Sequence, residues 1–133
     1  MRSSQDTYTL ANGVKMPCIG LGTYQSPDAV ASAAVKDAMA AGYRLIDTAA
    51  AYGNERGVGQ GIRISGVPRE EIFVTSKLRN AAHGYQATLE AFDMTTEAIT
   101  GKLMWILGQT RAPAQIHRLF YTPVANDILN YRT

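Results

Sequence analysis

Asp47, Tyr52 and Lys77 are three side chains that could together protonate a carbonyl group. Asp47 and Tyr52 belong to the run Ile46–Glu55, and Lys77 belongs to Val74–Leu78. A phenol is a weak acid, and a nearby ammonium favours its ionised form. A carboxylate beside that ammonium would hold it in place. A tyrosine flanked in this way could give a proton to a carbonyl oxygen while a hydride reaches the carbonyl carbon.

The same residue types also have ordinary structural explanations. A strand-terminal aspartate often caps the next helix, a loop tyrosine often packs against its neighbours, and a lysine is usually solvated. The spacing alone leaves both explanations open. The catalytic hypothesis therefore depends on elements that bring the three side chains to one place.

The candidate segments lie at the ends of predicted strands that alternate with predicted helices. The strands are predicted over 18–22, 44–47 and 72–76, and the helices over 26–41, 54–65 and 85–92. Before them, the turn Asn12-Gly13 predicts a hairpin over 7–17. This alternation is typical of a parallel sheet covered by helices, in which ligand-binding groups gather at the carboxyl ends of the strands.

The alternation fails after Asp93. Apolar residues at helical spacing predict one helix over 94–108, capped by Thr95 or Thr96, and a short second helix over 112–123. No fourth strand is predicted in this part of the chain. The sequence therefore predicts an α/β fold made of a hairpin and three βα units, followed by a two-helix tail.

Composition and charge exclude several classes of function. The 13 basic residues are scattered, so no basic cluster is available to follow a nucleic-acid backbone. A single cysteine, Cys18, excludes an internal disulfide. The first residues lack the apolar core of a signal peptide, and no apolar run is long enough for a membrane span. We therefore expect a cytoplasmic protein with no membrane, nucleic-acid or metal partner.

Four segments resemble the amino-terminal third of the aldo-keto reductases. They are LANGVKMPCIGLGTYQSP, AGYRLIDTAAAYGNE, PREEIFVTSKL and HGYQATLEAFD, and they cover about residues 7–93. The strings DTAAAYGNE and TSKL, in this order, are the most specific part. The resemblance implies a TIM (β/α)8 barrel, here a partial one, whose function is to reduce aldehydes and ketones with NADPH.

The resemblance also implies roles for individual residues. Tyr52 would be the general acid, Lys77 would promote its proton transfer, and Asp47 would pair with Lys77. The residues implied to touch the ligands are Gly22, Thr23 and Asp47 for the cofactor and Tyr24 for the substrate. The subgroup resembled includes bacterial 2,5-diketo-gluconate and glyoxal reductases, which implies a small carbonyl substrate such as a dicarbonyl.

The sequence departs from the resembled family in several places. The family's catalytic histidine follows its fourth strand, whereas His117 lies in a predicted helix and His83 is expected to be structural. Arg79 stands where the family usually has tryptophan. A barrel of this kind needs about 250 residues, and the later strands that hold the nucleotide are not found here. We therefore expect little or no turnover from these residues alone.

The residues after Asp93 carry a second resemblance. DMTTEAITGKLMWILGQT and IHRLFYTPVANDIL resemble the carboxyl-terminal end of a cytoplasmic-type L-asparaginase. This implies a gene fusion at Phe92-Asp93, with a truncated reductase domain over 1–93 and a helical tail over 94–133. The competing hypothesis is a divergent tail. The alternative function is a non-catalytic interaction module or a remnant of the fusion, and the module would self-associate through its unclosed sheet edges.

Overall fold

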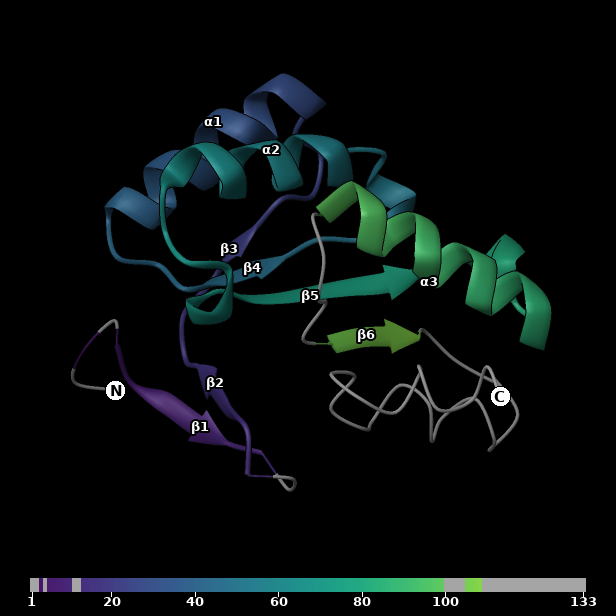
Figure 1. Ribbon diagram of the computed structural model, residues 1–133, viewed down its shortest axis with the longest axis horizontal. Coiled ribbons are helices and arrows are strands. Elements are labelled where there is room, and N and C mark those ends of the chain that lie inside the picture. Colours follow the sequence, from purple (N-terminus) through teal and green to yellow (C-terminus); the bar gives the residue numbers. More distant parts are fainter. Residues whose placement is uncertain (1–2, 4, 11–12, 100–104, 109–133) are drawn as a thin grey trace.

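The computed structural model describes residues 3, 5–10, 13–99 and 105–108, and its centre is a parallel sheet (Figure 1). The strands follow the order β3-β4-β5-β6 and comprise Leu21–Gly22, Leu45–Asp47, Phe73–Leu78 and Trp105–Gly108. The register pairs Gly22 with Asp47, and Asp47 with Thr75. The carboxyl ends of β3 and β4 therefore lie side by side, and β5 continues past the end of β4 to Leu78.

The helices that connect the strands are α1 (Asp28–Ala40), α2 (Glu55–Ser65) and α3 (Tyr85–Ile99), and they lie on one side of the sheet (Figure 1). Two predicted helix ends are confirmed. Gly42 (φ 93°) and Gly66 (φ 72°) adopt the left-handed conformation that closes α1 and α2. Within the described residues, no helix has the length and apolar character that a membrane crossing requires.

The core lies between the helices and the sheet. Ile46, Val58, Val74 and Ile99 are all fully buried there, and burial of such side chains stabilises a fold by about 1.5–3 kcal/mol each. Helix α2 approaches both neighbours closely. A Cβ at Gly57 or Gly61 would overlap backbone carbonyls of α1, and one at Gly59 would overlap the carbonyl of Ala98 in α3. The glycines of α2 thus allow backbone-to-backbone packing on two sides.

The predicted hairpin is confirmed and lies at the end of the sheet where the strands begin (Figure 1). Strands β1 (Thr7–Thr9) and β2 (Lys15–Pro17) pair antiparallel, and Gly13 has a φ of 83°. Asn12, the other turn residue, lies outside the described residues. The Gln5 side chain donates a hydrogen bond to the Gly42 carbonyl (2.9 Å), which ties the hairpin to the end of α1.

The predicted helix over 94–108 and the predicted lack of a fourth strand are both wrong. Helix α3 runs from Tyr85 through Asp93 to Ile99, and Trp105–Gly108 forms β6, parallel to β5. A short apolar run fits a strand as well as a helix. The free edge of β5 decides between them, because β6 satisfies its unpaired backbone groups. The second predicted helix, over 112–123, lies outside the described residues.

Thr95 and Thr96 do not cap a helix, contrary to the prediction. Both lie inside α3, so no free N–H groups of a first turn are near them. The buried Thr95 hydroxyl donates a hydrogen bond to Glu55 Oε2 (3.1 Å), and Thr96 donates one to the Phe92 carbonyl (2.8 Å). Thr95 therefore joins α3 to the start of α2.

Candidate active site

Asp47 and Lys77 form an ion pair at the carboxyl ends of β4 and β5. Lys77 lies two residues beyond Thr75, the register partner of Asp47, and therefore on the same face of the sheet. Its Nζ donates to Asp47 Oδ1 (2.8 Å), to Asp47 Oδ2 (2.7 Å) and to the Thr48 carbonyl (3.1 Å). All three donors of the ammonium thus have acceptors, and its position is fixed.

A neighbouring hydroxyl holds the Asp47 carboxylate in turn. Thr75 donates a hydrogen bond of 2.6 Å to Asp47 Oδ1, and a charge-assisted bond of this kind is stronger than a neutral one. The Asp47 side chain keeps 42% of its surface exposed, against 19% for Lys77. The ion pair is therefore ordered but open to solvent on one side.

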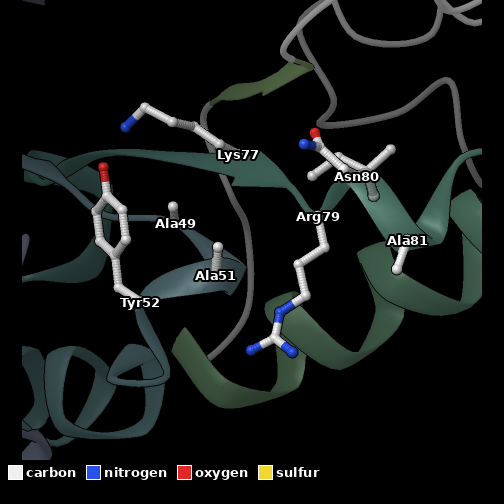
Figure 2. Close-up of a pocket in the computed structure, with 8 residues that line it drawn as sticks. Ala49, Ala51, Tyr52, Lys77, Arg79, Asn80 and Ala81 are labelled. Atoms are coloured by element: carbon white, nitrogen blue, oxygen red, sulfur yellow. The ribbon is translucent and has the colours of Figure 1, made fainter.

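Tyr52 lies over this ion pair. It ends a short 3₁₀ turn, η1 (Ala50–Tyr52), which Gly53 closes with a φ of 68°. The Lys77 Nζ is 5.4 Å from the centroid of the Tyr52 ring, and the Tyr52 hydroxyl points towards the ammonium (Figure 2). The structure thus brings together the three side chains that the sequence analysis selected.

The predicted substrate residue, Tyr24, packs against Tyr52. The two ring centroids are 5.0 Å apart, with the planes tilted by 58°. Tyr24 is 67% exposed. Next to Tyr52 and Lys77 lies an open hollow of about 490 Å³, which these two residues line together with Ala49, Ala51, Leu78, Arg79, Asn80 and Ala81 (Figure 2).

The predicted cofactor residues Gly22 and Thr23 differ in how far they are exposed to solvent. Gly22 is exposed, and a Cβ at this position would meet no described atom within 4 Å. Thr23 is 2% exposed, and its hydroxyl donates to Thr48 Oγ1 (2.9 Å). The Thr23 side chain therefore fixes the loop after β3, while Gly22 leaves free space beside Asp47.

A buried polar network behind the site was missed in the sequence analysis. Asn54 is 1% exposed, and its amide donates to the carbonyls of Thr23 and Ser26, at 2.8 Å each. Thr48 donates its hydroxyl hydrogen to Asn54 Oδ1 (3.2 Å). Asn54 thus connects the loops after β3 and β4, and so supports the backbone that carries Asp47. From the sequence, Asn54 is only the first residue of the helix predicted over 54–65.

Glu55 connects the helices to the strand that carries Lys77. Its Oε1 accepts a hydrogen bond from Ser76 (2.6 Å), and its Oε2 accepts the one from Thr95. Ser76 is 1% exposed and points to the opposite face of β5 from Lys77. A carboxylate between α2, β5 and α3 therefore fixes the strand from the helix side.

The sequence model of the aldo/keto reductase family matches residues 18–104. The chain belongs to the aldo/keto reductase family. The match continues past Asp93, through α3. The parallel sheet with helices on one side agrees with the expected α/β fold of this family.

Known relatives and solved structures agree with this assignment. The chain is 52% identical over 100 residues to 9,11-endoperoxide prostaglandin H2 reductase of Trypanosoma cruzi, covering 74% of this chain and 35% of the relative. It is 51% identical over 98 residues to glyoxal reductase of Bacillus subtilis, covering 73% and 36%. The chain thus spans about a third of the length of these relatives.

Solved structures of aldo-keto reductases share the fold. An aldo-keto reductase from a deep-sea metagenome library of the Medee basin superposes with a TM-score of 0.79 at 41% identity, covering 94% of this chain and 46% of that one. An aldo-keto reductase of Bombyx mori in complex with NADP gives a TM-score of 0.68 at 37% identity, covering 78% and 36%.

The fourth strand, β6, contains no histidine that could match the family's catalytic histidine. The resemblance places that histidine at the end of the strand after β5, but β6 has the sequence Trp-Ile-Leu-Gly and Gln109 follows. His117 lies outside the described residues, and His83 is exposed just before α3. Among the described residues, the candidate site therefore consists of Tyr52, Lys77 and Asp47.

Proposed function

We propose that this chain carries the proton-donating part of an NADPH-dependent carbonyl reductase, with Tyr52 as the general acid. The observation that supports this most is the position of Lys77, which lies beside the Tyr52 ring and is fixed by Asp47 and Thr48. Surface packing alone does not explain a lysine with three acceptors directly beside an available phenol.

The protein's own part of the reaction is a proton transfer. The Tyr52 hydroxyl gives its proton to the carbonyl oxygen of the substrate, and the negative charge left on the phenolate faces the Lys77 ammonium. Asp47 and Thr48 hold that ammonium in place, so little reorganisation is needed when the charge develops. The phenolate later regains its proton from water, since the hollow beside it is open.

The residues at the end of β3 fit a nicotinamide ring. Gly22 is exposed, with free space where a side chain would be, and its register partner is Asp47. NADPH, when bound, would supply the hydride that reaches the carbonyl carbon. Gly22 and the exposed side of Asp47 would lie beside it, and Thr23 would hold the loop through its buried hydroxyl.

The proposed substrates are small carbonyl compounds, including dicarbonyls. One relative is named a glyoxal reductase, and the hollow beside Tyr52 opens to solvent rather than forming a long closed channel. Tyr24, which is exposed and packed on the Tyr52 ring, would line the entrance.

We expect slow turnover from the 133 residues alone. They span about a third of the relatives' length, and a site open to water gives weak electrostatic stabilisation. The alternative, a fusion remnant or interaction module with an asparaginase-like tail over 94–133, finds support neither among the relatives nor in the described contacts. Thr95 and Ile99 are instead built into the reductase-like part.

The test is product formation from methylglyoxal and NADPH during long incubation with the purified chain. We expect slow formation of the hydroxy product, reduced by about a hundredfold or more in Tyr52→Phe, as for loss of a general acid. Tyr85→Phe, at an exposed position of α3 away from the hollow, is the matched control. Equal product with the wild type and Tyr52→Phe would contradict the proposed function.

A further inference from the structure

Arg79 is a second cation at the hollow that the proton transfer does not use. It follows β5 directly and lines the hollow with Lys77. Its Nε and Nη2 both donate to the Ala50 carbonyl, at 3.0 and 2.8 Å. Figure 2 shows its guanidinium on the other side of Ala51 from the Lys77 ammonium. The hollow thus has a positive group on each side.

The two cations differ in how their charge is compensated. Lys77 pairs with Asp47, and the other ion pair within the described part of the chain joins Arg44 to Glu71. Arg79 meets only a neutral carbonyl there. No acidic side chain is among the described residues that line the hollow. The side that Arg79 lines therefore carries positive charge without a counterion from these residues.

The geometry of Arg79 suits an anion. A guanidinium has five N–H donors in a fixed fork, and the bonds to Ala50 use Nε and one hydrogen of Nη2, so that the Nη1 edge is available. Because Ala50 already holds the side chain, binding would cost little additional side-chain entropy. A carboxylate accepts two parallel hydrogen bonds from such a fork.

We propose that Arg79 forms an anion subsite, and that the preferred substrates are carbonyl compounds with a carboxylate a few bonds from the reacting carbon. This inference rests on the proposed function, since the carbonyl would lie at Tyr52 while the carboxylate reaches Arg79 past Ala51. Arg79 has a positioning effect as well, because Ala50 belongs to the turn that carries Tyr52. The experiment must separate the two effects.

The probes are levulinate and its methyl ester, which differ only in the carboxylate charge. Binding of each to the full chain is measured by titration calorimetry with wild type, Arg79→Gln and Arg63→Gln. Arg63 is an exposed arginine in the last turn of α2 and is the matched control. We expect wild type and Arg63→Gln to bind the acid about fivefold more tightly than the ester, as for an exposed charge pair. We expect Arg79→Gln to bind both alike.

Two results would overturn the subsite. Equal affinity of the wild type for acid and ester is one. The other is an equal loss of affinity for both probes in Arg79→Gln, because it would mean that Arg79 only holds the turn that carries Tyr52. NADPH binding by Arg79→Gln should match the wild type, and a parallel loss there would assign the anion to the cofactor instead.

The outcome for the proposed function is read separately, from Tyr52-dependent product formation. A preference for the acid without such product would retain the anion site and reject the reductase. Tyr52-dependent product without a preference for the acid would retain the reductase and reject the anion site.

Discussion

The two faces of β5 show how one strand serves chemistry on one side and stability on the other. Thr75 and Lys77 point to the site, where both reach the Asp47 carboxylate. Ser76, between them, points to the helices and donates to the Glu55 carboxylate. Alternation along a strand produces this division. Asp47 pairs with a cation and keeps an exposed surface, whereas Glu55 accepts hydrogen bonds from two hydroxyls between packed elements. Changes on the site face should therefore mainly reduce product formation, and changes on the helix face should mainly reduce stability.

Lys77→Met tests the site face and should have the largest effect. Product formation is expected to fall by about a hundredfold or more, because the charge left on Tyr52 loses its ammonium. The free energy of unfolding should change by about 1 kcal/mol or less, since the ion pair is open to solvent. Urea unfolding and product assays measure the two quantities. Lys36→Met, at an exposed position of α1, is the control. Unfolding of Lys77→Met but not of this control would contradict the division between chemistry and stability on the two faces of β5.

Gly59→Ala tests the helix side. The new Cβ would overlap the Ala98 carbonyl, and such overpacking is expected to cost about 2.5 kcal/mol. Urea unfolding followed by circular dichroism measures it, with Gln60→Ala on the exposed side of the same helix as the control. Unchanged stability would show that α3 beyond Asp93 does not pack on α2 in solution.

Glu55→Ala removes the carboxylate that accepts hydrogen bonds from Ser76 and Thr95. We expect a loss of about 2 kcal/mol in the free energy of unfolding, because two hydrogen bonds to a charged group disappear and two buried hydroxyls are left without their acceptor. Product formation per folded molecule should stay close to that of the wild type. Glu97→Ala, exposed on α3, is the control. A large loss of product at full folding would mean that Glu55 takes part in the chemistry.

Thr75→Val should have the smallest effect. It keeps the shape of the side chain and removes one hydrogen bond to Asp47 Oδ1, while both bonds from Lys77 remain. We expect a reduction in product formation of about fivefold, equivalent to roughly 1 kcal/mol. A loss as large as that of Lys77→Met would show that the hydroxyl, rather than the ammonium, fixes the carboxylate.

The site was more predictable from sequence than the fold around its last strand. Asp47, Tyr52 and Lys77 are chemically distinctive and follow strands that β-branched residues and glycine stops define clearly. Trp105–Gly108 has no such signal, because its apolar residues suit either a helix or a strand, and only the free edge of β5 decides. Asn54 and Glu55 looked like residues at a helix start, since nothing local reveals that their partners are Thr23, Ser76 and Thr95.

The central claim is that Tyr52 and Lys77 act as one unit on the site face of β5. A double-mutant cycle on product formation, with Tyr52→Phe, Lys77→Met and the combined variant, tests it most directly. If the ammonium acts through the phenol, the combined variant forms about as much product as the single variant that forms less. Losses that multiply in the combined variant would show that the two side chains act independently, and would contradict the account.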